Sequence, residues 1–105
     1  MGLFGQFGTD INQGVADFRE TQGAVLLDVR SSAEYAGGHI PGSVNIPLDG
    51  IQAVLTKYPD RQTPLFVYCL SGGRSGRAVR FLKDAGYTSV INIGGIGAYK
   101  GEGSR

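Results

Sequence analysis

The sequence predicts an α/β domain that is doubly wound, with a mainly parallel central sheet flanked by helices. Apolar runs of strand length alternate along the chain with segments in which apolar residues recur at helical spacing. The run at 24–29 is apolar apart from Asp28, which is typical of a strand buried on both faces of a parallel sheet. The length of 105 residues accommodates one hydrophobic core and is too short for two domains.

The first half of the chain contains clear helix and strand patterns. Ile11, Val15 and Phe18 follow helical spacing, and this helix should stop before the glycine at position 23. Ser31 and Glu34 are spaced as a capping box, which marks the start of a short second helix. The expected elements are therefore a helix at 10–21, a strand at 24–29, a short helix at 31–38 and a strand at 43–46.

The second half repeats the alternation. Ile51, Val54 and Leu55 predict a helix that begins at Asp49 or Gly50. This helix is followed by a strand at 65–68, a helix at 75–86 capped by Ser75, a strand at 89–93 and a glycine-rich tail at 94–97. We expect the domain to span 10–100, between a loosely held arm at 1–9 and a C-terminal tail at 101–105.

Cys69, the only cysteine, ends the apolar run at 64–68 and begins a small, glycine-rich turn. A loop from a strand end into a helix start points unpaired N–H groups inward, and the helix dipole adds to their field. Both effects favour the thiolate, which is the reactive form of cysteine. Ligands of doubly wound sheets bind at the carboxyl ends of the strands, where Cys69 lies. We therefore interpret Cys69 as a nucleophile rather than as a small buried apolar residue.

The remaining composition excludes several classes of function. A net charge of +1 indicates neither nucleic acid nor an anionic membrane as a partner. His39 is the only histidine, so no Cys/His metal cluster is expected, and no nucleotide-binding glycine motif indicates a cofactor. The apolar N-terminus lacks the features of a signal peptide, and no run reaches membrane-spanning length. A free thiol then predicts the reducing cytoplasm.

Three stretches carry a resemblance to a known family. They are Asp28-Val29-Arg30 with Glu34-Tyr35 and the segment 38–47, the loop 69–75, and the segment 92–96. In this order and spacing, the chain over 24–99 resembles the single-domain rhodanese-type sulfurtransferases. The resemblance implies a persulfide intermediate on Cys69, cradled by the backbone amides of residues 70–74. Tyr99 stands where the family usually has a tryptophan.

Loop length distinguishes sulfur transfer from phosphatase chemistry, the two reaction types that a cysteine loop in this fold suggests. Cysteine phosphatases place an arginine six positions after the cysteine, in a loop wide enough for a tetrahedral phosphoryl group. Here Arg74 is five positions after Cys69, and Ser75 occupies the sixth. The smaller ring suits a single sulfur atom, so sulfur transfer ranks above phosphatase or arsenate-reductase activity. The expected reaction moves sulfur from a thiosulfate-like anion to cyanide, a thiol or a protein. The alternative is a non-catalytic sulfur carrier or regulatory docking module.

Several side chains around the thiol have two interpretations each. Arg74 either neutralises the anionic end of the donor or is a solvated loop charge, and Ser75 either contacts the persulfide or caps the helix. Arg30 either contributes to an anion pocket or pairs with Glu34. Gly72 and Gly73 permit positive φ angles close to bound sulfur. The predicted sulfur-binding residues are Leu70, Ser71, Gly72, Gly73, Arg74, Ser75 and Arg30.

Three further features have mainly structural interpretations. Asp28 lies within an apolar strand and must be hydrogen-bonded there. His39 precedes a turn that it is expected to stabilise rather than acting as a base. A row of basic residues recurs every three positions along the helix at 75–86, either as a docking face or as a solvated surface: Arg74, Arg77, Arg80 and Lys83.

Overall fold

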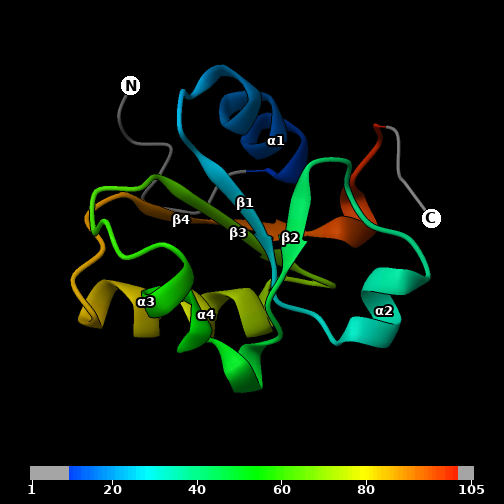
Figure 1. Ribbon diagram of the computed structural model, residues 1–105. Helices are drawn as coiled ribbons and strands as arrows, with labels where there is room; N and C mark the ends of the chain where they lie inside the picture. The colour runs from blue at the N-terminus through cyan, green and yellow to red at the C-terminus, as the bar shows by residue number, and fades with distance from the viewer. Residues whose placement is uncertain (1–9, 102–105) are drawn as a thin grey trace.

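A computed structural model describes residues 10–101 and shows a central sheet of four parallel strands (Figure 1). The strand order is β2-β1-β3-β4, so each crossover between neighbouring parallel strands carries helical structure. The expected doubly wound α/β fold is confirmed. The strands are β1 (Val25–Asp28), β2 (Ser43–Asn45), β3 (Leu65–Cys69) and β4 (Val90–Gly95).

Helices cover both faces of the sheet. In Figure 1, α1 lies above it, whereas α3 and α4 lie below it. The side chains of β3 alternate between the two resulting cores: Leu65, Val67 and Cys69 face α3 and α4, and Phe66 and Tyr68 face α1. The helices are α1 (Ile11–Glu20), α2 (Ser32–Ala36), α3 (Ala53–Lys57) and α4 (Gly73–Asp84), with short 3₁₀ turns η2 (Leu48–Gly50) and η3 (Ile96–Ala98).

The elements differ from the sequence-based expectation in the second half of the chain. The helix expected at 49–58 is divided into η2 and α3, because the Leu48 amide donates to the Val29 carbonyl at 3.1 Å and ties η2 to the end of β1. The last strand continues through Gly94 and Gly95, which we expected in a tail. A register shift after Val67 on β3 accompanies this extension and gives the edge strand a bulge.

The capping of α4 also differs from expectation. Gly72 is the N-cap, and Ser75 is in the first helical turn, because the chain turns sharply at Gly72 with φ of 105°. The capping box at α2 is confirmed: the Ser31 hydroxyl accepts from the Glu34 amide, and the Glu34 carboxylate accepts from the Ser31 amide. The predicted arm at 1–9 and most of the predicted tail, 102–105, lie outside the described residues.

Candidate active site

Cys69 is the last residue of β3 and lies at the carboxyl edge of the parallel sheet. Its side chain is buried, with 1% of the residue exposed. The following residues Leu70 and Ser71 are exposed, and the chain then reverses at Gly72 into the first turn of α4. The thiol therefore lies inside the strand-to-helix loop that the sequence predicted.

Hydrogen-bond donors converge on the Cys69 sulfur. The Gly72 amide donates to Sγ at 3.0 Å, and the Ser75 hydroxyl lies 3.3 Å from it. Burial raises the pKa of the Cys69 thiol, but hydrogen bonds from the Ser75 side chain and from the backbone of Ser75, Gly72 and Ser71 lower it and together outweigh the effect of burial. The net pKa is below the ordinary value, so the site favours the thiolate.

Asn92 holds this loop from the neighbouring strand. Its side-chain oxygen lies 2.8 Å from the Ser75 hydroxyl and accepts from the Gly94 amide at 2.9 Å, while its amide nitrogen donates to the Gly72 carbonyl at 3.2 Å. We did not identify Asn92 as a functional candidate from its own chemistry. The available signal was a lone polar amide between the apolar residues Ile91 and Ile93 of an expected strand.

Glycines allow β4 to approach the loop closely. A Cβ atom at Gly95 would overlap the Leu70 carbonyl oxygen and would lie 2.6 Å from the Ser71 Cα. Gly72 has a positive φ angle, as expected. Gly73 does not, and a Cβ atom there would meet nothing within 4 Å, so this position does not require glycine for conformational reasons.

Arg30 is a buried structural cation. Its guanidinium binds the Asp28 carboxylate at 2.7 Å and the Gly38 carbonyl at 2.8 Å, and Asp28 is completely buried. The alternative pairing of Arg30 with Glu34 is therefore wrong, because the Arg30 guanidinium binds Asp28, two residues earlier at the end of β1. The expectation that Asp28 is hydrogen-bonded is confirmed. An additional anion contact by Arg30 stays a prediction.

Arg74 pairs with Glu34 across the mouth of the loop. The two guanidinium nitrogens lie 2.8 and 3.0 Å from the two carboxylate oxygens, and both side chains are about one-third exposed. Arg74 and the capping contacts of Ser31 lower the pKa of Glu34 to about 2. Arg74 is thus neither a solvated loop charge nor an unpaired cation.

His39 stabilises its turn, as predicted. Its Nδ1 lies 2.8 Å from the Tyr35 carbonyl, and its ring stacks on that of Tyr35 with 3.7 Å between centroids. Among residues 10–101, no group of three or more His, Cys, Asp or Glu side chains is arranged to hold a metal ion. Over the same range, no helix is long and apolar enough to cross a membrane.

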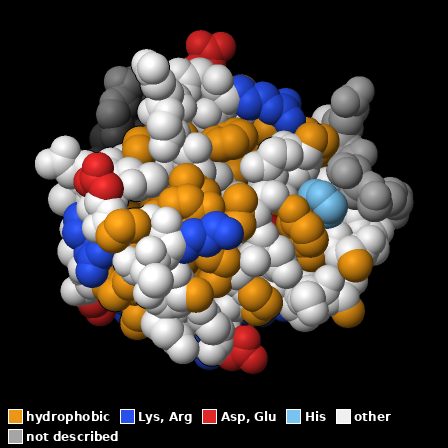
Figure 2. All heavy atoms as spheres, viewed as in Figure 1, with side chains coloured by type: hydrophobic (Ala, Val, Ile, Leu, Met, Phe, Trp, Pro, Cys, Tyr) orange, Lys and Arg blue, Asp and Glu red, His pale blue; other side chains and the backbone are white. Residues whose placement is uncertain are grey.

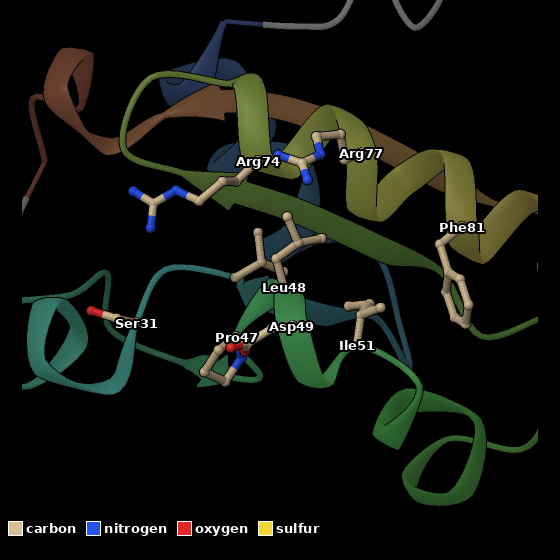
Figure 3. Close-up of a pocket in the computed structure, with 9 residues that line it drawn as sticks. Ser31, Pro47, Leu48, Asp49, Ile51, Arg74, Arg77 and Phe81 are labelled. Carbon is tan, nitrogen blue, oxygen red and sulfur yellow. The ribbon is translucent and has the colours of Figure 1, made fainter.

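A pocket of about 540 Å³ lies beside the loop, between α4 and the chain at η2 (Figure 3). Val29 and Ile51 belong both to its wall and to the core cluster that contains Cys69. Arg74 connects the pocket to the cysteine loop. The pocket is lined by Val29, Ser31, Pro47, Leu48, Asp49, Ile51, Arg74, Arg77 and Phe81.

Similar proteins share both sequence and fold with this chain. The protein named thiosulfate sulfurtransferase PspE of Escherichia coli K12 is 39% identical over 71 residues, which are 67% of this chain and 68% of that protein. Thiosulfate sulfurtransferase GlpE of Pseudomonas savastanoi is 36% identical over 70% of this chain and 69% of its own. A solved structure described as rhodanese with anions from E. coli matches with a TM-score of 0.73 and 34% identity, covering 78% of this chain and 98% of that one.

One family profile matches nearly the whole described part of this chain. The sequence profile for the rhodanese-like domain covers residues 12–102, which include β1 to β4, the cysteine loop and the capping box of α2. With these elements placed around a buried thiol at the carboxyl edge of a parallel sheet, the chain belongs to the rhodanese-like domain family.

Proposed function

We propose that this protein is a sulfurtransferase of the thiosulfate type and that Cys69 carries the sulfur as a persulfide. The observation that supports this most directly is the convergence of the Gly72 amide and the Ser75 hydroxyl on a thiol of lowered pKa. Such a thiol is an activated nucleophile without a separate general base. The thiosulfate sulfurtransferase names of two relatives support the same substrate class.

The reaction proceeds by double displacement. The Cys69 thiolate attacks the outer sulfur of thiosulfate, a new sulfur–sulfur bond forms, and the original one breaks with its electron pair leaving on sulfite. The product is a Cys69 persulfide anion. Cyanide, a small thiol or a protein cysteine then attacks the outer persulfide sulfur and takes it, which regenerates the thiolate. The sulfur atoms and charges balance in each half, and no metal or redox cofactor enters either step.

The loop residues act on the charge that moves during these steps. In this proposal the backbone amides of residues 70–74 donate to the outer sulfur, as the Gly72 amide does to Sγ at 3.0 Å, because preorganised donors stabilise negative charge. The Arg74 guanidinium lies at the mouth, where the departing sulfite carries charge. Its pairing with Glu34 fixes the orientation of the planar fork before the donor arrives.

Persulfide formation is tested by mass. Mixing reduced protein with thiosulfate in the absence of an acceptor should add one sulfur atom to the intact mass, and cyanide should remove it. Cys69→Ser should show no adduct, because Cys69 is the only cysteine. Absence of an adduct from thiosulfate and other sulfane donors would contradict the proposal and favour a docking module.

A sulfur-carrier role is the second candidate. A Bacillus subtilis relative named a putative sulfur carrier protein is 38% identical over 65% of this chain, although the match covers only 36% of that protein. Enzyme and carrier differ in turnover: an enzyme catalyses many transfers from thiosulfate to cyanide, whereas a carrier is loaded once and discharges to its partner.

A phosphatase-like activity ranks third because Ser75, rather than an arginine, occupies the sixth position after Cys69. Because a free thiol persists in a reducing compartment, we also propose that the protein acts in the cytoplasm.

A further inference from the structure

The Ser75 hydroxyl lies among three hydrogen-bond acceptors beside the sulfur. Its oxygen is 3.3 Å from Cys69 Sγ, 3.0 Å from the Gly72 carbonyl oxygen and 2.8 Å from Asn92 Oδ1. Ser75 is completely buried. A hydroxyl has one proton, so it donates to one of these acceptors at a time. The direction of this proton therefore decides whether the sulfur receives a hydrogen bond from Ser75.

The Gly72 carbonyl is already occupied by two amide donors. The Gly76 backbone amide donates to it at 3.0 Å, and the Asn92 side-chain amide donates to it at 3.2 Å. A carbonyl oxygen has two lone pairs, so these two donors fill its capacity. The proton of the Ser75 hydroxyl is then left with two acceptors, Cys69 Sγ and Asn92 Oδ1.

The side-chain amide of Asn92 is fixed in one orientation. Its Oδ1 accepts from the Gly94 backbone amide at 2.9 Å, while its Nδ2 donates to the Gly72 carbonyl. A rotated amide would place its NH₂ group against the Gly94 N–H and its oxygen against the Gly72 carbonyl, and both hydrogen bonds would be lost. Asn92 Oδ1 thus keeps one lone pair for the Ser75 hydroxyl.

The charge on the sulfur selects between the two acceptors. A protonated thiol is a weak acceptor and a donor itself, so its S–H points to the Ser75 oxygen and the hydroxyl donates to Asn92. A thiolate accepts a charge-assisted hydrogen bond, which is about twice as strong as one between neutral groups. The hydroxyl therefore turns from Asn92 to the sulfur when the thiol loses its proton.

We propose that Asn92 is a positioning residue that holds the Ser75 hydroxyl proton while the Cys69 sulfur is neutral and releases it when this sulfur becomes an anion. Its consequence for sulfur transfer rests on the proposed function. During discharge, cyanide attacks the outer sulfur of the persulfide, the sulfur–sulfur bond breaks, and its electron pair moves to Cys69 Sγ. As this charge develops, the hydroxyl turns from Asn92 to Sγ and stabilises the leaving thiolate.

The charged groups around the thiol occur in two ion pairs. Arg74, in the first turn of α4, acts electrostatically on the thiol and is bound by Glu34, whose pKa is about 2. Asp28, at the end of β1, is bound by Arg30. β4 has no ionisable side chain, and Tyr68 of β3 faces the opposite core. Because a guanidinium stays protonated, the charges of the Arg74 pair are constant where the thiol titrates.

The side-chain amide resonances of Asn92 provide the first test. In an NMR titration of the reduced wild-type protein, they should shift with the same midpoint as the thiol, which the rate of alkylation against pH measures independently. This shift should be lost in Cys69→Ala and mostly lost in Ser75→Ala, because no hydroxyl then moves between acceptors. Asn45 is the matched control in the same spectra, since its side-chain amide binds two backbone carbonyls at the end of β1. An Asn92 resonance that does not follow the thiol, or that shifts equally in Ser75→Ala, would overturn the proposal.

The single histidine is separated from the thiol by the same variants. Histidine also changes charge near neutral pH, and the histidine side chain of this protein (pale blue) reaches the surface in Figure 2. A shift of the Asn92 resonances caused by this histidine would remain in Cys69→Ala. A shift caused by the thiol would be absent there, so the proposal requires that Cys69→Ala abolish the titration.

A carboxylate in place of the Asn92 amide tests the consequence for sulfur transfer. Asn92→Asp keeps an acceptor for the Ser75 hydroxyl but gives it a negative charge, so the proton should stay there. Discharge of the persulfide to cyanide should then slow about 10-fold in stopped-flow measurements. Asn45→Asp is the matched control, because it makes the same exchange at an amide that also binds backbone carbonyls, and it should change discharge less than about 2-fold. Equal slowing by the two variants would contradict the role of Asn92.

A double variant separates the hydroxyl from a general effect of charge. Asn92→Asp combined with Ser75→Ala should slow discharge less than the product of the two single effects, because the carboxylate then has no hydroxyl proton to hold. An effect equal to that product would show that Asn92 acts independently of Ser75 and would overturn the proposal. Failure of the proposed function is distinguishable, since a protein that forms no persulfide from any donor would still show the Asn92 titration if the proton moves as described.

Discussion

Arg74 and Glu34 form a bidentate ion pair that joins the first turn of α4 to the first turn of α2, with N–O distances of 2.8 and 3.0 Å. One of the same carboxylate oxygens, Oε1 of Glu34, accepts a hydrogen bond from the Ser31 amide at 2.9 Å. A single carboxylate thus caps one helix and holds the arginine that follows the cysteine loop. The cap was visible in the sequence, whereas the partner of the arginine was not.

Glu34→Gln should reveal a pH-dependent contribution to stability. Because the folded-state pKa of Glu34 is about 2 and its ordinary value is 4.5, the pair stabilises the fold fully above pH 4.5 and loses this effect as pH falls toward 2. Gln retains an oxygen for the Ser31 amide, so the variant isolates the charge. Urea unfolding should show a difference of less than about 1 kcal/mol at pH 7, as is typical of exposed pairs, and none near pH 2. A difference that stays constant with pH would contradict this assignment.

Arg74→Ala should slow loading of the persulfide more than its discharge. Negative charge accumulates on the departing sulfite only in the first half-reaction, so the guanidinium matters most in that transition state. Because Glu34 already shares this charge, we expect a loss of about 10-fold, at the low end for a charge-assisted contact. Stopped-flow measurement separates the halves, with Arg80→Ala as the control. Equal slowing of loading by thiosulfate and unloading by cyanide would show that Arg74 has no role specific to sulfite.

Ser75→Ala should raise the pKa of Cys69. The Ser75 hydroxyl lies 3.3 Å from the sulfur and is the leading hydrogen-bond contribution that lowers the pKa of the thiol. Its loss should raise the pKa of the thiol, because a hydrogen bond to the charged form of the sulfur is removed. The rate of alkylation against pH measures the shift. Ser71→Ala is the control, because Ser71 lowers this pKa through its backbone alone, and a matching shift in that variant would contradict the role of the Ser75 hydroxyl.

Gly72→Ala and Gly73→Ala should differ although the residues are neighbours. Gly72 has φ of 105°, so a side chain there should destabilise the fold by about 1–2 kcal/mol and displace the amide that donates to Cys69. Gly73 is helical, and alanine should leave stability unchanged or raise it by about 0.4–1 kcal/mol. Denaturant midpoints and the thiol pKa report both effects. Similar destabilisation by the two variants would mean that the turn does not depend on the conformation of Gly72.

Local sequence determined the parts of this protein that depend on neighbouring residues. The apolar run before Cys69 and the glycines after it are enough to specify strand, tight turn and helix, because strand burial and positive φ are properties of a short segment. The capping box of Ser31 and Glu34 is equally local. From these elements the fold class, the position of the thiol and the lowered pKa of Cys69 were predictable.

Tertiary structure alone decided which side chains meet around the thiol. Arg74 is 40 residues from Glu34, and Ser75 is 17 residues from Asn92, so no spacing rule pairs them. The parallel sheet gathers the carboxyl ends of β1, β3 and β4, and the pairing of β4 with β3 brings Asn92 to the loop. The pocket exists only because η2 is tied to β1 and faces α4. A pairing of this kind depends on where separate strands end in space, which a local pattern does not contain.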